Sequence, residues 1–141
     1  MDTSSPLDPA LLEHTLTHVF STWVRELDLQ LIQARAGEVV LALPVAPKHV
    51  HAGGVMSGQT LMAAADTAMV LAVTSQLGAF RPITTVQMQT SFLRPVAPGA
   101  GPAKVTARVL RLGKSLVFGE VHIETGAGQL AAHATTTYAL L

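Results

Sequence analysis

Asp66 is the residue whose type and position most strongly suggest chemistry. It follows three alanines and precedes Ala68 and Met69, and the chain has no Lys or Arg between residues 55 and 80. An ionised carboxylate buried without a partner costs on the order of several kcal/mol, so some benefit must offset its presence. A catalytic carboxylate is one such benefit, because desolvation makes a carboxylate a better base or nucleophile. The alternative is a structural Asp that bonds to Thr67, to a strand hydroxyl or to backbone donors.

Ser57 and Gly58 lie at the start of the same apolar segment. Ser is a favoured N-cap, and Gly lets another group approach the backbone N–H groups at the positive end of a helix dipole. A helix start of this kind can bind an oxyanion or a carbonyl, and a plain cap is the alternative. A Ser-His-Asp hydrolase built from Ser57, His51 and Asp66 is disfavoured, because residues 54–58 lack the Gly-x-Ser-x-Gly spacing of a nucleophile elbow.

The histidines do not predict a metal site. His49 and His51 could supply two ligands, but no nearby His or carboxylate completes a set of three. We interpret the remaining histidines as surface or packing positions, namely His14, His18, His122 and His133.

Composition bounds the function. The chain has 141 residues, which suits one domain, and its nine basic and nine acidic residues give a formal charge of zero. This balance argues against a nucleic-acid partner, which requires a basic face. Charged residues make up 13% of the chain and apolar residues 49%, so we expect part of the apolar surface to be buried between subunits. The absence of cysteine excludes disulfides and thiolate chemistry.

A membrane span is not expected from the sequence. The most apolar stretch, residues 61–73, is shorter than the roughly 18 residues that a span needs and is interrupted by Asp66 and Thr67. The first residues show no positive region ahead of an apolar one, so no secretory signal is predicted. The expected location is therefore cytoplasmic.

The first 26 residues are predicted to form a tail and one helix. Asp8 followed by Pro9 is a helix-start signature, because proline's missing donor costs nothing at the first helical position. Apolar residues then recur at helical spacing, at Leu12, Leu16, Val19, Phe20, Trp23 and Val24. We expect this face to pack on a partner surface and the helix to end before Leu27, leaving residues 27–141 as the main domain.

The remaining segments predict one long helix and several strands. Leu27, Leu29 and Leu31 alternate with their neighbours, residues 36–37 turn, and residues 38–43 continue as a second strand. Residues 55–77 are apolar on every side, which predicts a helix buried all round. Further strands are expected at residues 83–94, 103–112, 115–124 and 130–140. Successive strands joined by short turns pair as antiparallel neighbours, so the predicted fold class is α+β, with the long helix cradled in a curled antiparallel sheet.

Four motifs in this part of the chain are specific when taken together. They are Gly-Gly-Val-Met-Ser-Gly at 53–58, Leu-Met-Ala-Ala-Ala-Asp-Thr-Ala at 61–68, Thr84-Thr85 followed by Ser-Phe-Leu-Arg-Pro at 91–95, and Leu-Arg-Leu-Gly-Lys-Ser at 110–115. The chain from about residue 27 to residue 141 thereby resembles the hotdog-fold acyl-CoA thioesterases of the phenylacetate-pathway (PaaI-like) group. The resemblance implies the hotdog fold and hydrolysis of acyl-CoA to free acid and CoA, without a metal or redox cofactor.

The resemblance also implies roles for individual residues. In the family a helix acid lies nine positions after the His of a His-Gly-Gly motif, and here Ser57, Gly58 and Gln59 occupy that motif. Asp66 is then the general base or nucleophile, and the Gly58 N–H polarises the thioester carbonyl. Gln59 is assigned to substrate binding. His51 stands where the family often has an Asn or Gln that holds the carbonyl or the water.

The partners follow from the same resemblance. Thr85 matches a Ser or Thr that positions water from the facing subunit, so Asp66 of one chain would face Thr85 of another. A homo-oligomer is therefore expected, either a dimer or a dimer of dimers (a homotetramer). Arg94, Arg111 and Lys114 lie near the expected strand ends, where they could meet CoA phosphates or belong to solvated turns.

Two other functions stay open at this point. An enoyl-CoA hydratase of the same fold would use an Asp and His pair on the loop before the helix, and Asp66 lies deeper than that. A non-catalytic acyl-CoA-binding module would be stabilised by ligand without turning it over. The sequence leaves the identity of the acyl group open, and it does not choose between the nucleophilic and general-base roles of Asp66.

Overall fold

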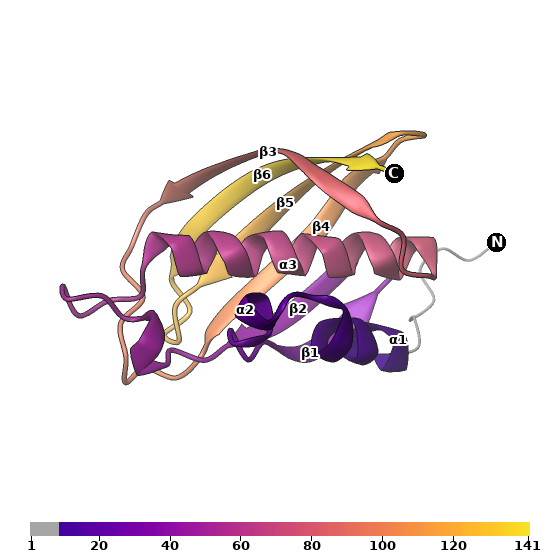
Figure 1. Ribbon diagram of the computed structural model, residues 1–141. Coiled ribbons are helices and arrows are strands. Elements are labelled where there is room, and N and C mark those ends of the chain that lie inside the picture. The colour runs from indigo at the N-terminus through magenta and orange to yellow at the C-terminus, as the bar shows by residue number, and fades with distance from the viewer. Residues whose placement is uncertain (1–8) are drawn as a thin grey trace.

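The computed structural model describes residues 9–141, which form one antiparallel sheet curved around a long helix (Figure 1). The helix is α3 (Gly58–Leu77) and the sheet has six strands in the order β1-β2-β4-β5-β6-β3. In the view of Figure 1, β3, β6 and β5 arch over α3, and β1 and β2 lie below it with the short N-terminal helices. This arrangement confirms the α+β class.

The N-terminal region forms three short helical pieces, so the prediction of one continuous helix is wrong. The pieces are α1 (Pro9–His14), a π-helical turn η1 (Thr15–Val19) and α2 (Thr22–Arg25). The break falls at Phe20 and Ser21, whose backbones are extended. The hydroxyls of Thr15 and Thr17 donate to carbonyls four residues back, a pattern that bends helices. The predicted cap at Asp8 lies outside the described residues.

The expected apolar face of this region is only partly buried. Leu12 and Leu16 enter the core, whereas the Trp23 side chain is 58% exposed and Val19 is 41% exposed. The break explains the exposure of Trp23, because it takes α2 out of the helical register that would have placed all six apolar residues on one face.

The predicted first hairpin is confirmed, but its first strand begins at Gln30 rather than at Leu27, and its register shifts between Leu31 and Gln33. Leu27 and Leu29 are buried, and β1 (Gln30–Arg35) pairs antiparallel with β2 (Glu38–Leu43). The turn between them uses Gly37 at a φ of 83°, a left-handed conformation that glycine adopts without strain. Residues 36–37 therefore turn the chain as predicted.

Helix α3 begins and ends at sequence signals. The Ser57 side chain caps the start by accepting from the Thr60 N–H at 3.3 Å, and Gly78 ends the helix at a φ of 77°. By length and composition this helix could cross a membrane, with a mean hydropathy of 1.3 over its most apolar window. Two-thirds of that window is buried in the fold, where the helix packs against the sheet as its core element.

The prediction that this helix is buried all round is wrong along one stripe. Gln59 and Met62 are exposed, and Ala63, Asp66 and Val70 are only half-buried. These residues recur at intervals of three or four, so they share one face of the helix. The sheet therefore leaves one face of α3 uncovered, and Asp66 lies on it.

The remaining strands agree closely with the predicted ranges. They are β3 (Ile83–Phe92), β4 (Ala103–Leu112), β5 (Leu116–Glu124) and β6 (Leu130–Leu140). Strands β4, β5 and β6 pair in succession, but β3 pairs with β6 at the edge of the sheet, so the expected pairing of β3 with β4 is wrong. The proline-rich loop after β3 takes the chain to the other side of the sheet, where β4 pairs with β2. Val96 in this loop is buried, and its backbone carbonyl accepts a hydrogen bond from the Met56 N–H.

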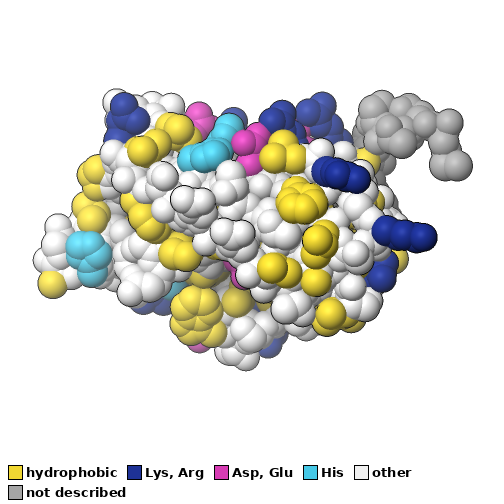
Figure 2. All heavy atoms as spheres, turned by 90° about the horizontal axis from the view of Figure 1, so that it is seen from above, with side chains coloured by type: hydrophobic (Ala, Val, Ile, Leu, Met, Phe, Trp, Pro, Cys, Tyr) yellow, Lys and Arg dark blue, Asp and Glu magenta, His cyan; other side chains and the backbone are white. Residues whose placement is uncertain are grey.

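The sheet has a buried inner face and an outer face with mixed chemistry. Along β5 the odd-numbered residues from Val117 to Ile123 are buried against α3, and the even-numbered residues point outward. Figure 2 shows the molecule from above, with exposed hydrophobic side chains scattered among polar ones and with histidine and acidic side chains next to each other. Leu110 and Phe118 are among the exposed apolar residues of the outer face.

Candidate active site

Asp66 lies in the middle of α3 and is held by two hydroxyl groups from the sheet. The Tyr138 hydroxyl donates to its Oδ1 at 2.8 Å, and the Thr85 hydroxyl donates to the same oxygen at 3.0 Å. The described residues provide no further partner for Oδ2. The carboxylate is therefore fixed by one oxygen, while the other remains available on the open face of the helix.

Tyr138 is the functional neighbour that the sequence analysis missed. It is the only tyrosine of the chain and its side chain is completely buried on β6. Burial, reinforced by the charge of Asp66 and the hydrogen bond to it, raises the pKa of Tyr138 far above its ordinary value. The hydroxyl thus remains a donor throughout the physiological range. Its inward position in the period-two pattern of β6 was a usable signal, because a buried tyrosine hydroxyl needs a polar partner.

Thr85 reaches Asp66 within the same chain. The resemblance implied that Thr85 would face the Asp66 of another subunit, whereas the structure shows the two side chains of one chain hydrogen-bonded across β3 and α3. The residue is exposed on the edge strand, so its hydroxyl is accessible to solvent as well as to the carboxylate. Thr85 is thus placed both to orient Asp66 and to contact a water molecule beside it.

The start of α3 presents free backbone donors. Ser57 is the N-cap and Gly58 is the first helical residue, so the Gly58 N–H has no acceptor within the helix. No bond from this N–H to another group occurs in the described part of the chain. A Cβ at Gly58 would lie 3.3 Å from the ring of Phe92, which explains why glycine suits this position. Phe92 is half exposed and lies beside the helix start.

Asp66 and Gly58 of one chain are too far apart along the helix to act on one carbonyl. Eight residues at 1.5 Å per residue separate them by about 12 Å along the axis. A reacting carbonyl needs its donor within about 3 Å of the oxygen and its nucleophile within about 3.5 Å of the carbon. The single chain therefore presents two half-sites rather than one complete site.

His51 and Gln59 lie near the start of α3, and their assignments to the thioester site stay predictions. The His51 ring accepts a hydrogen bond from the Gly53 N–H at 2.8 Å through Nδ1, which ties it to its own loop. Its backbone also bonds to Val55 and Gly54 in the turn before α3. This geometry makes His51 a loop-shaping residue. Gln59 is exposed in the first turn of the helix, where it is free to contact a ligand.

The three basic residues assigned to substrate binding do not gather in one chain. Arg94 follows β3 and donates to the Leu130 carbonyl at 2.9 Å, at the end of the sheet where α3 begins. Arg111 and Lys114 belong to the β4–β5 hairpin, at the opposite end of the sheet. All three are exposed. Within one chain, only Arg94 lies at the end that carries the Gly58 donor.

Two cavities in the described part of the chain lie away from this site. One of about 410 Å³ opens between the N-terminal helices and β1, and another of about 340 Å³ lies near Pro44 and Pro102. Neither is lined by Asp66, Gly58 or Thr85. Asp66 lies on the partly exposed stripe of α3, beside Thr85 on the exposed edge strand β3.

Comparison with known proteins identifies the class of this architecture. The Escherichia coli PaaI protein from the phenylacetic acid degradation operon superposes with a TM-score of 0.83, covering 97% of this chain and 96% of that chain at 20% identity. A hypothetical thioesterase from Streptococcus pneumoniae, solved with coenzyme A, gives a TM-score of 0.74 over 80% of this chain and 85% of its own at 19% identity. The helix wrapped by a curved antiparallel sheet is thus the hotdog fold.

The family follows from sequence similarity. Residues 53–132, more than half of the chain, match the family described as Thioesterase superfamily. The protein named "Putative esterase TV1331" from Thermoplasma volcanium is 32% identical over 106 residues, which are 75% of this chain and 77% of that protein. The chain belongs to the thioesterase superfamily, and the matched segment contains Gly58, Asp66 and Thr85.

Proposed function

We propose that this protein hydrolyses acyl-CoA thioesters to the free acid and CoA. The observation that carries the proposal is the Asp66 carboxylate, which is held through Oδ1 by Tyr138 and Thr85 and keeps Oδ2 on the open face of α3. Two donors on one oxygen fix its orientation, and an oriented carboxylate is what a general base or nucleophile requires.

The proposed chemistry uses the helix start as the electrophilic element. Attack on the thioester carbon develops negative charge on the carbonyl oxygen, and a backbone N–H at a helix start stabilises that charge. In the general-base route, Asp66 takes a proton from water as the water oxygen bonds to the carbon. The carbon–sulfur bond then breaks, and the proton is returned to the leaving CoA sulfur. In the nucleophilic route, an Asp66 oxygen bonds to the carbonyl carbon, the carbon–sulfur bond breaks and CoA leaves as a thiolate that takes up a proton. Water then hydrolyses the anhydride, which releases the acid and regenerates Asp66.

We further propose that two chains build each site. The axial separation of about 12 Å between Gly58 and Asp66 is removed if the Gly58 of a second chain approaches the Asp66 of the first. The β3 strand has one unpaired edge of ten residues, which is a template for pairing with another copy. A two-fold axis perpendicular to that edge would pair the two β3 strands antiparallel and set the two α3 helices antiparallel, so that the start of one helix faces the middle of the other.

The exposed apolar residues support the same assembly. Met62, on the stripe of α3 that contains Asp66, is 37% exposed, and Val86 and Phe92 on the edge strand β3 are 59% and 50% exposed. Burying this surface between copies removes hydrocarbon from water and would form the walls of a cleft. Neither a dimer nor a dimer of dimers conflicts with this geometry.

The proposed substrate class is supported by the Streptococcus pneumoniae structure, which holds coenzyme A. A CoA molecule carries several phosphate charges, which basic side chains bind well. If the helices of two chains are antiparallel, Arg94 of one chain approaches the sheet end that carries Arg111 and Lys114 of the other. The three residues could then contact one CoA from two subunits.

The test is a thiol-release assay with purified protein across aryl, short-chain and medium-chain acyl-CoA thioesters. The D66N variant should lose nearly all hydrolysis while its thermal unfolding stays close to that of the wild type, because Asn keeps the size and one accepting oxygen. D28N is the matched control, since Asp28 is an exposed acid whose nearest cation, Lys48, is 4.0 Å away.

Full activity in D66N would contradict the assignment of Asp66. Ligand-induced stabilisation of the wild type without CoA release from any thioester would instead identify a non-catalytic acyl-CoA-binding module. Addition of water to an enoyl-CoA, without release of a thiol, would identify the hydratase alternative.

A further inference from the structure

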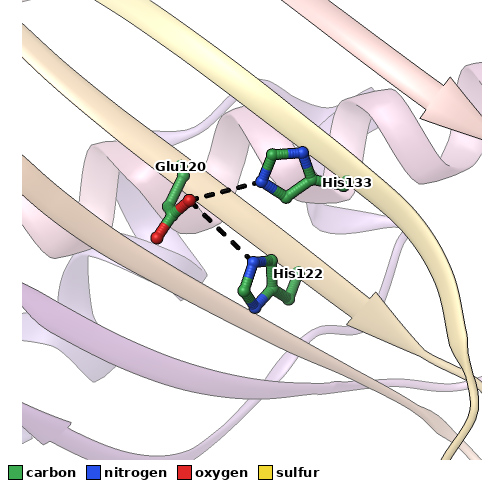
Figure 3. Close-up of side chains that lie close together, drawn as sticks. All are labelled: Glu120, His122 and His133. Atoms are coloured by element: carbon green, nitrogen blue, oxygen red, sulfur yellow. Dashed lines mark hydrogen bonds and ion pairs between the residues drawn. The ribbon is translucent and has the colours of Figure 1, made fainter.

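Three side chains on the outer face of the sheet converge in a way that the proposed hydrolysis does not use. Glu120 and His122 lie two residues apart on β5, so they point to the same face. His133 on β6 is paired directly opposite His122. Figure 3 shows the Glu120 carboxylate pointing toward both imidazole rings. In sequence, His122 and His133 are eleven residues apart and give no metal-ligand signature, whereas the sheet register places them side by side.

The distances among the three side chains suit a small divalent metal. The Oε2 atom of Glu120 is 3.3 Å from Nε2 of His133 and 3.9 Å from Nε2 of His122. One potential ligand atom from each residue lies within 4.8 Å of the other two. Ligands at about 2.0 to 2.1 Å from a tetrahedral zinc ion are separated from one another by about 3.4 Å. The Glu120 and His133 atoms already have this separation, and a small rotation of the half-exposed His122 side chain would bring in the third.

Arg108 supports the carboxylate from the other side. Its guanidinium donates to Oε1 of Glu120, which leaves Oε2 facing the two histidines. Metal-bound carboxylates are commonly held by a hydrogen bond of this kind to the oxygen that does not bind the metal. The hydrogen bond with His133, together with Arg108, lowers the pKa of Glu120 against the opposing effect of burial, so the carboxylate is ionised at neutral pH.

We propose that Glu120, His122 and His133 form a binding site for a divalent transition-metal ion of the zinc type, with water as the fourth ligand. Two imidazoles and one carboxylate are a donor set that such ions prefer. Binding replaces the hydrogen bond between His133 and Glu120 with bonds from both side chains to the metal, and Nε2 of His133 then offers its lone pair rather than a proton. The site clamps β5 to β6, on the face of the sheet opposite α3 and Asp66, and its role is therefore to stabilise the sheet rather than to hydrolyse the thioester.

Calorimetric titration of untagged protein with Zn²⁺ alone tests the proposal. The wild type should bind one Zn²⁺ per chain with a Kd of roughly micromolar or lower. At a free Zn²⁺ concentration of 100 times Kd, Tm should rise by about 5 to 10 °C. The E120Q and H133N variants should each bind at least about 10-fold more weakly, because each removes a ligand that the other two cannot replace. D66N should bind Zn²⁺ like the wild type, so failure of the proposed hydrolysis would leave this result unaffected.

The chain offers a matched control in its other histidine pair. His14 and His18 stack in the N-terminal helical region with ring centroids 4.6 Å apart, without a carboxylate in the pair. The H14N/H18N double variant should retain wild-type Zn²⁺ binding. In wild-type protein, NMR of the imidazole nitrogens should show Zn²⁺ acting on Nε2 of His122 and His133, a measurement that does not depend on any variant folding.

Three results would overturn the proposal. They are no Zn²⁺ binding by the wild type, undiminished binding in both E120Q and H133N, and loss of binding in H14N/H18N. Any of them would reduce the three side chains to a hydrogen-bonded network on the sheet surface.

Discussion

Replacing Gly58 by Pro removes one backbone donor from the start of α3 without forcing a new conformation on the chain. Gly58 is the first helical residue, a position where proline is favoured because its fixed φ suits a helix and its N–H is not needed there. Ser57 before it has φ −66° and ψ 148°, which is the extended conformation that a residue preceding proline adopts. G58P should therefore fold.

The expected effect of G58P is on catalysis. If the Gly58 N–H stabilises the developing oxyanion, its loss should lower kcat by about 100- to 1,000-fold, which corresponds to about 2.7 to 4 kcal/mol in the activation free energy. The G58A variant is the matched control, because it keeps the N–H and adds the same Cβ at 3.3 Å from the exposed Phe92 ring. G58A should lose far less activity than G58P. Steady-state thiol release with both variants, together with their thermal unfolding, makes the comparison.

Mixing variants tests whether the two halves of the site come from different chains. In an exchanged 1:1 mixture of G58P and D66N, half of the dimers are mixed, and each mixed dimer has one site with an intact Gly58 and an intact Asp66. Activity should therefore return to about a quarter of the wild-type value, although each variant alone is nearly inactive. No recovery after proven subunit exchange would refute a shared site. Equal activity of G58P and wild type would refute the role of the N–H.

Further predictions concern the groups that hold Asp66. Y138F should lower the free energy of unfolding, measured in urea, by about 1.5 to 3 kcal/mol. In a D66A background the same substitution should cost nearly nothing, because the buried hydroxyl has already lost its acceptor. Equal costs in both backgrounds would contradict the hydrogen bond. T85A should lower turnover and largely spare substrate binding, and a loss of binding alone would argue against a role in positioning water. Because the pKa of Tyr138 is raised in the folded state, the unfolded chain loses the Tyr138 proton first above about pH 10. Above that pH, the free energy of unfolding of the wild type should therefore fall more steeply than that of Y138F, by up to about 1.4 kcal/mol per pH unit. Parallel pH profiles of unfolding would contradict the raised pKa.

The strand and helix ranges of the main domain could be predicted because each carries a local signal. The period-two alternation and the turn residues gave β2, β4 and β6 with the bounds that the structure shows, and Ser57 marked the start of α3. The order of strands could not be predicted in the same way. Pairing of β3 with β6 depends on where a proline-rich loop takes the chain, and this contact joins segments that are far apart in sequence.

The break in the N-terminal helix also escaped prediction. Apolar spacing continues from Leu16 through Trp23, so the pattern fits one helix, but spacing does not report the competing side-chain bonds of Thr15 and Thr17. The exposure of Trp23 follows from that local competition.

In the candidate site, the sequence was most informative about residues whose chemistry is improbable in their surroundings. An acid in an apolar helix indicates a function or a partner, and the structure supplies both the partner hydroxyls and an accessible face. The period-two pattern of β6 could mark Tyr138 as a buried residue in need of a partner, but the partners of Tyr138 and of Glu120 could not be assigned from sequence, because they depend on cross-strand register. Register is set by the whole sheet, and no local pattern of residue types reveals which distant residue a side chain will meet.

The link between Asp66 and Tyr138 has a consequence for biosynthesis. The two residues are 72 positions apart, and Tyr138 belongs to β6, which follows the other five strands of the sheet along the chain. When α3 is complete, the strands that will shield its apolar sides do not yet exist, and the nascent helix meets water or a chaperone with its carboxylate unrestrained. Docking of the C-terminal strand both covers that hydrocarbon and orients the acid, so truncated or incompletely translated chains would lack an ordered Asp66 as well as a finished core.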